Sequence, residues 1–126
     1  MTPFGEKIRK LRTERNLTLR DMAGAIGVSS AYLSALEHGK RGRPGWHLIQ
    51  RIITYFNIIW DEAEDIVRLA RISHPRITID TSGLSPRATE LANRLADDIG
   101  KIDEDMLREM IAVLERKKQK PRGFTG

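Results

Sequence analysis

The sequence predicts an all-α protein with five short helices, a linker and a pair of longer helices. The leading observation is residues 17–39, which read as two short capped helices around a glycine turn. The segments on either side repeat apolar residues at helical spacing. The composition agrees, because 40% of the 126 residues are apolar, which is enough for a helical core although only seven are aromatic. We therefore expect one helical domain followed by an appendage.

The first helix is expected over residues 3–15. Thr2 can cap it, and Pro3 suits a first helical turn. Phe4, Ile8 and Leu11 then share one face, which predicts that this face points into the core.

The second helix is expected over residues 19–26. Thr18 is a good N-cap, and Asp21 three positions later comes close to a capping-box pattern. Apolar residues follow at i, i+3, i+4 and i+7, namely Leu19, Met22, Ala23 and Ile26.

The third helix, residues 30–38, follows a tight turn. Gly27 stands where a left-handed residue is favoured, Val28 fills the turn and Ser29 can cap the new helix. Gly39 ends it. The residues expected to face inward are Leu33 and Leu36.

Two more helices are expected after a basic loop at residues 40–45. The fourth covers residues 46–56 and is broken at Asn57, and the fifth covers residues 61–72. Their apolar residues are Leu48, Ile49, Ile52, Ile53, Phe56, Ala63, Ile66, Val67, Leu69 and Ala70.

Residues 73–85 read as a linker. Within it, residues 76–80 alternate apolar and polar side chains, which is typical of a short strand. A lone strand of this length needs a partner, and the same segment of a second chain could supply it.

The last two helices are expected over residues 86–100 and 104–118. Ser85 and Pro86 open the first, Gly100 ends it, and Asp103 caps the second. They predict an antiparallel helical hairpin, which must pack on the first domain or on a second copy because it cannot bury both faces alone. Residues 119–126 are expected to be a basic disordered tail.

Charge is unevenly placed along the chain, whose formal net charge is +5. Residues 1–57 hold ten Lys and Arg against four Asp and Glu, and residues 116–126 hold five basic residues and no acid. Residues 58–115 hold seven basic and thirteen acidic residues. The basic segments favour a polyanionic partner, and the acidic segment does not.

Several classes of protein are disfavoured by the sequence. There is no cysteine, which excludes disulfides, thiolate catalysis and cysteine-ligated zinc. His38, His47 and His74 lack the spacing of metal ligands, so no metal and no cofactor are expected. No apolar run approaches the roughly 20 residues that span a bilayer, and no signal peptide is recognisable, so a cytoplasmic location is expected.

Residues 17–39 resemble the helix-turn-helix of the Xre/Cro/C1 family of bacterial and phage DNA-binding regulators, and the resemblance extends from about Phe4 to about Phe56. It implies a five-helix, lambda-repressor-like domain over residues 1–72, followed by the linker 73–85 and the hairpin 86–118. Many members carry Gln where this chain has Leu19, so the resemblance does not imply the phosphate contact that this Gln makes in those members. The matching residues are Leu17, Ala23, Gly27, Val28, Ser29, Leu33, Ser34, Leu36, Glu37 and Gly39.

The resemblance also implies roles for individual residues on double-stranded DNA. Base edges in the major groove would be met by Ser30, Ala31, Ser34 and Ala35. Contacts with the DNA backbone would come from Thr18, Arg20, Tyr32, His38, Lys40, Arg41 and Arg43. Tyr32 could instead be a half-buried surface residue, and His38 could simply cap a helix end. Glu37 would pair with Arg12 to stabilise the fold.

The function implied is a sequence-specific transcriptional regulator, in particular a repressor that binds an inverted repeat as a homodimer. The dimer contact is expected from the hairpin residues Leu91, Leu95, Ile99, Leu107, Met110, Ile111 and Leu114. Two alternatives stay open: an antitoxin whose hairpin or tail binds a toxin, and a regulator that uses the same fold to bind a protein. An enzyme is not expected, because no triad, phosphate loop or metal cluster is recognisable.

Overall fold

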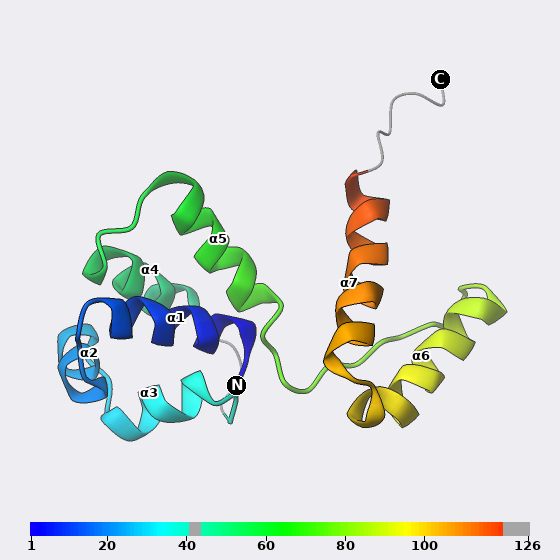
Figure 1. Cartoon of the computed structure of the whole chain (residues 1–126), viewed down its shortest axis with the longest axis horizontal. Coiled ribbons are helices and arrows are strands. Elements are labelled where there is room, and N and C mark those ends of the chain that lie inside the picture. The colour runs from blue at the N-terminus through cyan, green and yellow to red at the C-terminus, as the bar shows by residue number, and fades with distance from the viewer. Residues whose placement is uncertain (41–43, 120–126) are drawn as a thin grey trace. The chain divides into compact units, whose positions relative to one another are not determined.

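The computed structural model of the chain describes residues 1–40 and 44–119 (Figure 1). Over these residues it contains seven α-helices, one short 3₁₀ turn and no strand. The chain divides into two compact units, Met1–Thr78 and a second unit that begins at Ile79. The predicted all-α class, with a five-helix domain followed by a helical pair, is therefore confirmed.

The first unit consists of five helices whose bounds lie within one or two residues of the predicted ones. They are α1 (Pro3–Glu14), α2 (Leu19–Ile26), α3 (Ser30–Glu37), α4 (Trp46–Tyr55) and α5 (Trp60–Arg71). Two of the breaks between helices have a local cause, because Asn16 and Asn57 adopt left-handed backbone conformations, with φ of 54° and 55°. Asparagine tolerates this region better than most residues, so the chain can turn directly after α1 and α4.

A single apolar core holds the first unit together. Helix α1 packs against α3 and α5, α2 packs against α3 and α4, and α4 packs against α5. The predicted inward-facing residues Phe4, Ile8 and Leu11 are buried in this core. The other large residues that are almost completely buried are Met22, Ile26, Leu33, Ile52 and Ile66.

The second unit contains α6 (Pro86–Asp98), a 3₁₀ turn (Ile99–Lys101) and α7 (Glu104–Gln119). Ser85 and Asp103 cap the two helices, since their side chains accept hydrogen bonds from the Ala88 and Met106 amides at 3.3 and 2.9 Å. Helix α6 is shorter than predicted, because Gly100 lies inside the 3₁₀ turn that follows it. The two helices diverge from this turn (Figure 1), and none of the described side chains of the unit is buried.

The predicted strand at residues 76–80 is wrong for the single chain. These residues are exposed and have no regular secondary structure. A five-residue segment with no neighbouring strand cannot complete a ladder of backbone hydrogen bonds, so it stays irregular here.

None of the described helices is both long enough and apolar enough to cross a membrane.

Candidate nucleic-acid interface

The geometry of the α2–turn–α3 segment is set by its capping residues. The Asp21 amide donates to Oγ1 of Thr18 at 3.0 Å, and the Thr18 amide donates to Oδ2 of Asp21 at 3.2 Å, which completes a capping box. Gly27 has a φ of 78° and ends α2 in the left-handed region. Ser29 then caps α3 by accepting a hydrogen bond from the Tyr32 amide at 3.0 Å. The two helices are thus joined by a short, fixed turn.

The capping box also changes the acidity of Asp21. The pKa of its carboxyl group is lowered from its ordinary value, first because the Thr18 amide donates a hydrogen bond to the carboxylate. The Thr18 side chain and the charge of Arg20 lower this pKa further. The hydrogen bonds of the folded capping box therefore stabilise the charged form of Asp21.

Helix α3 shows small side chains to the solvent at its N-terminal end. Ser30 and Ala31 are exposed, and Ser34 and Ala35 one turn later are partly exposed. The opposite side of the helix is fixed in the core by Leu33 and Leu36. The four residues predicted to meet base edges therefore all lie at least partly on the open surface of α3.

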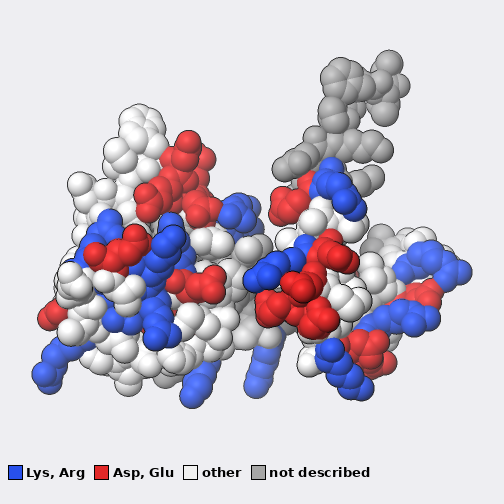
Figure 2. Space-filling view, viewed as in Figure 1, with Lys and Arg blue, Asp and Glu red and all other residues white. Residues whose placement is uncertain are grey.

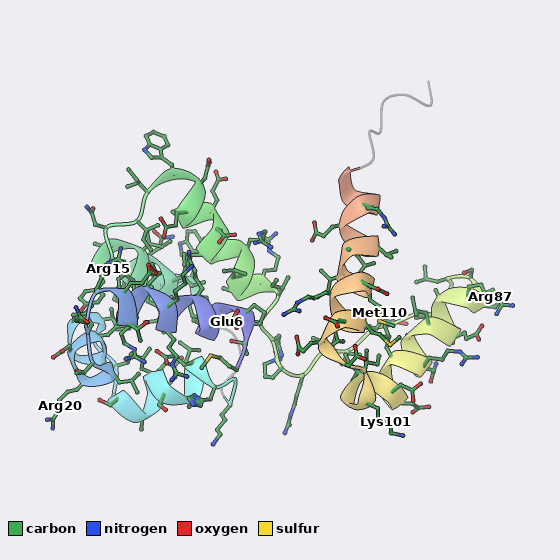
Figure 3. All side chains as sticks on the ribbon, in the orientation of Figure 1. Glu6, Arg15, Arg20, Arg87, Lys101 and Met110 are labelled. Carbon is green, nitrogen blue, oxygen red and sulfur yellow. The ribbon has the colours of Figure 1, made fainter. Side chains whose placement is uncertain are left out.

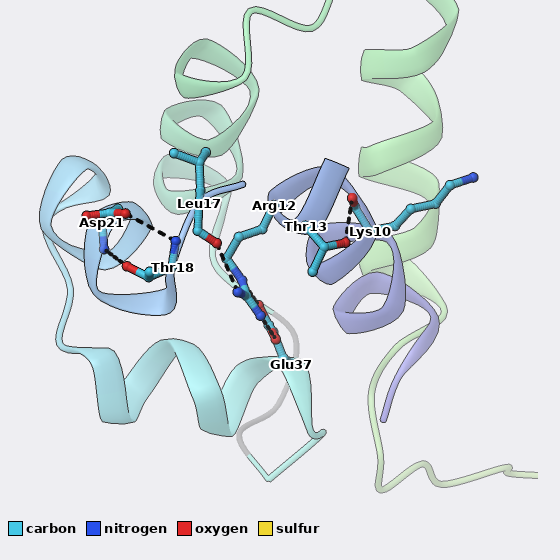
Figure 4. Close-up of polar contacts among 7 residues, drawn as sticks. All are labelled: Lys10, Arg12, Thr13, Leu17, Thr18, Asp21 and Glu37. Atoms are coloured by element: carbon cyan, nitrogen blue, oxygen red, sulfur yellow. Dashed lines mark hydrogen bonds and ion pairs between the residues drawn. The ribbon is translucent and has the colours of Figure 1, made fainter. Parts of the chain in front are cut away.

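An ion pair joins α3 to α1 (Figure 4). Nε and Nη2 of Arg12 donate to Oε2 and Oε1 of Glu37 at 3.2 and 3.3 Å, and Nη1 of Arg12 donates to the Leu17 carbonyl at 3.1 Å. The Glu37 side chain is only 2% exposed, so the guanidinium neutralises a carboxylate that water hardly reaches. One side chain thus ties the end of α3 to both α1 and the loop before α2.

The residues predicted to contact the DNA backbone are spread around the same segment. Thr18 and Arg20 are both exposed at the start of α2, and Figure 3 shows Arg20 projecting away from the domain. His38 and Lys40 are exposed directly after α3. Tyr32 is partly buried and packs against the core. Arg41 and Arg43 lie outside the residues that the structure describes.

Leu19, which stands where many relatives carry Gln, is partly buried and packs against the core. Its apolar side chain offers no hydrogen bond to a phosphate. The structure therefore gives this position a role in packing.

Two positioning residues were missed by the sequence reasoning. Nη1 of Arg51 on α4 donates to the Ile26 carbonyl at 3.0 Å and so holds the end of α2 at the turn. Oγ of the buried Ser73 accepts a hydrogen bond from the Phe4 amide at 2.8 Å and donates to the Leu69 carbonyl at 2.6 Å. The bonds from Arg51 to Ile26 and from Phe4 to Ser73 link distant parts of the chain, so no local pattern could reveal them.

No metal centre accompanies this surface in the described part of the chain, where no three His, Asp or Glu side chains lie close enough together to hold an ion.

Comparison with known proteins identifies the domain that carries this surface. Residues 3–64 match the family model described as a helix-turn-helix domain. The chain carries an Xre-like helix-turn-helix domain. The predicted resemblance is thereby confirmed, and the matched residues contain α1 to α4 and the beginning of α5.

Similar proteins include both a transcriptional repressor and a transcriptional activator. RghRB, an HTH-type transcriptional regulator of Bacillus subtilis (strain 168), is 38% identical over 61 residues, which are 48% of this chain and 44% of RghRB. The repressor RghR of the same strain is 41% identical over 61 residues, 48% of this chain and 45% of RghR. The activator BcrR of Enterococcus faecalis is 36% identical over 70 residues, 53% of this chain and 34% of BcrR. The chain thus covers less than half the length of each of these relatives.

Proposed function

We propose that the chain is a sequence-specific DNA-binding transcriptional regulator that inserts the N-terminal part of α3 into the major groove. The observation that carries this proposal is the structure of α3 itself. Its open surface has small side chains that allow close approach, while its other side is fixed by the core and by the Arg12–Glu37 pair. A rigid helix with one accessible face is what major-groove recognition by this motif requires. The regulators similar to this chain support the same function.

Base recognition in this proposal comes from short side chains. Ser30 and Ser34 can hydrogen-bond to several bases, and Ala31 and Ala35 can pack against a thymine methyl group. None of them makes the bidentate contact of Arg, Asn or Gln, which discriminates between bases by about 1–3 kcal/mol. We therefore expect the shape of the DNA to contribute a large part of the specificity.

Backbone contacts would position the domain without reading sequence. The described members of the proposed set lie on or next to α2 and α3, and they are Thr18, Arg20, Tyr32, His38 and Lys40. Arg41 and Arg43, which follow Lys40 closely in the sequence, complete the set. The basic members gain affinity through release of counterions from the phosphates, so their contribution should fall as salt rises.

We further propose that two copies bind together, through the second unit, to an inverted repeat with half-sites about 34 Å apart. The unit offers many apolar side chains and buries none of those described. Leu91, Ile99, Ile111 and Leu114 are all more than half exposed, and Met110 is exposed too, whereas Leu95 and Leu107 are partly buried. Repression is the simplest outcome, because a dimer on a promoter can exclude RNA polymerase by bulk alone.

A second candidate function rests on the same apolar surface of the second unit. If a different protein covers it, the chain would be an antitoxin or another regulator that holds a protein partner. The oligomeric state distinguishes the two candidates, because in a stable homodimer the second copy already covers that apolar surface.

The deciding experiment is selection of binding sites by the purified full chain from a random DNA pool at near-physiological salt. Recovery of an inverted repeat with half-sites one helical turn apart would support the dimeric regulator. The same selection with Ser34→Asn should recover a repeat that differs within each half-site. Absence of any enriched motif would overturn sequence-specific binding and favour the protein-binding candidates.

A further inference from the structure

The connection from α4 to α5 exposes two large apolar side chains in adjacent positions. Trp60 is 80% exposed, more than any other large apolar side chain that the structure describes, and Ile59 is 62% exposed. Isolated apolar residues are common on protein surfaces, but an adjacent pair of this size is a frequent mark of an interaction site.

The backbone at these two residues is unfavourable for the fold. Trp60 has a φ of 56°, in the left-handed region that bulky side chains rarely adopt. Ile59 occupies the N-cap position of α5, where its side chain can accept no hydrogen bond. Thr2, Thr18, Ser29 and Ser85 provide such a bond for α1, α2, α3 and α6. Two local rules are broken at the point where the apolar exposure is greatest, which favours a functional reason for these residues.

Carboxylates follow directly after the exposed pair. Asp61, Glu62, Glu64 and Asp65 lie in the first two turns of α5, and Figure 2 shows acidic side chains gathered beside an uncharged part of the first unit. Glu62 pairs with Lys7 at 3.7 Å and Asp65 with Arg68 at 2.6 Å. Asp61 and Glu64 have no ion-pair partner among the described residues. Their charge is therefore available to an external cation.

This part of the unit faces away from the proposed DNA contact. Helix α1 packs against both α3 and α5, and it lies between α3 and the start of α5 in Figure 1. DNA held by α3 would therefore leave Ile59 and Trp60 uncovered. The carboxylates would in any case be repelled by phosphates.

We propose that Ile59, Trp60, Asp61 and Glu64, here called the Trp60 surface, dock a different protein whose own surface has an apolar pocket edged by Lys or Arg. Trp60 would fill the pocket, as tryptophan commonly does at the centre of an interface. Asp61 and Glu64 would meet the basic edge and give the contact its charge preference. A second copy of the chain is a poor fit, because a symmetric contact would bring the same carboxylates together. The inference goes beyond the proposed function and does not depend on which DNA sequence is bound.

The test places a photo-crosslinking amino acid at position 64 of the full chain, in the cells from which it comes. The control carries it at position 71, an exposed residue at the other end of the same helix. Any protein captured at position 64 is identified and purified, and its affinity for the full chain is measured by titration. The affinity is compared among the unchanged chain, Trp60→Asn, Glu64→Lys and the control variant Arg71→Ala.

We expect capture at position 64 but not at position 71, and loss of capture in Trp60→Asn. Binding of the purified partner should weaken about tenfold or more in Trp60→Asn and in Glu64→Lys, and should weaken as salt rises. Because asparagine tolerates the left-handed conformation, Trp60→Asn should keep or raise the Tm, and it should bind DNA as before.

Four results would overturn the inference: equal capture at both positions, capture of a second copy of the chain, binding that neither variant weakens, or a Tm that falls in Trp60→Asn. The last would give Trp60 a purely structural role. A chain that captures the partner but selects no DNA motif would instead contradict the proposed function alone.

Discussion

Gly5 on α1 lies against the backbone of Glu37 on α3, so close that a Cβ atom on residue 5 would stand 2.1 Å from the Glu37 carbonyl oxygen. The neighbouring atom belongs to backbone and cannot rotate away as a side chain would. Glycine at this position therefore sets how deeply the end of α3 packs against α1.

Gly5→Ala should lower the free energy of unfolding by about 1–3 kcal/mol or more, because α1 and α3 must move apart to admit the methyl group. Thermal or denaturant unfolding measures the change. Gly24→Ala is the matched control, since a Cβ there has no neighbour within 4 Å and α2 is helical at that point. The free energy of unfolding of this control should be about 0.5–1 kcal/mol higher than that of the unchanged chain. Equal stability of the two variants would show that the packing distance between α1 and α3 is not fixed.

Removing one partner of the Arg12–Glu37 pair should be far more damaging than removing an exposed pair. Arg12→Ala would leave the Glu37 carboxylate uncompensated at 2% exposure, and such changes cost about 3–5 kcal/mol. Arg68→Ala, which breaks the exposed pair with Asp65, should cost less than about 1 kcal/mol. The double variant Arg12→Met, Glu37→Leu should be much more stable than Arg12→Ala, as judged by denaturant unfolding, because it leaves no buried charge unpaired.

The basic residues after α3 should govern affinity for all DNA sequences alike. Replacing Lys40, Arg41 and Arg43 by Ala should weaken binding to every sequence and flatten its dependence on salt, by about 0.9 in the logarithmic slope for each phosphate that is no longer neutralised. Fluorescence anisotropy across a salt series measures this slope. Ser30→Ala should instead change the relative affinity for different sequences and leave the slope alone. If the loop variants altered sequence preference without changing the slope, the two assignments would be reversed.

The apolar side chains of α6 and α7 should control the oligomeric state. Leu114→Asp and Ile111→Asp replace side chains that are 63% and 57% exposed in the single chain, so neither change removes a buried contact within it. Each should nevertheless shift the protein from dimer to monomer in sedimentation velocity. Asn93→Asp, an exposed polar position of α6, should leave the dimer intact. A wild-type chain that sediments as a monomer would contradict the homodimer proposal.

The capping box of α2 should make a small contribution to stability that depends on pH. The pKa of Asp21 is lowered in the folded protein, so its contribution is complete above the unfolded-state pKa of about 3.9 and is lost as pH falls through the lower, folded value. Thr18→Ala removes the cap and should cost about 0.5–2 kcal/mol near neutral pH. Measured against pH, the difference between this variant and the unchanged chain should narrow in the acid range. A difference that stayed constant from neutral pH to below the folded pKa would rule out the charged capping box.

The helices of both units could be predicted because their causes are local. Caps such as Thr2 and Ser29 and breaks such as Gly27 act over three or four residues, and the apolar spacing of each helix is visible in its own segment. The predicted strand at residues 76–80 failed because alternation describes a strand only when a partner exists, and the single chain provides none among its described residues.

The contacts that fix the helices relative to one another were harder to foresee. Arg12 and Glu37 were paired through a resemblance, because they are 25 residues apart and no spacing rule connects them. Arg51 and Ser73 bond to partners 25 and 69 residues away and had no such guide. The sequence does not single out Trp60 for a different reason, because its left-handed backbone and its exposure are properties of the folded chain alone.

The second unit has no buried side chain among those described, whereas the first has a complete core. If a separate protein covers this unit, as proposed above, that protein supplies part of the unit's stability, and the contribution grows with the concentration of the covering protein. On dilution the helix pair should loosen while the first unit stays folded. If a second copy covers the unit, the occupancy of an inverted-repeat DNA site rises roughly with the square of the protein concentration when that concentration is low. A twofold change in the amount of chain made in a cell would then cause a steeper change in the expression of the genes beside that site.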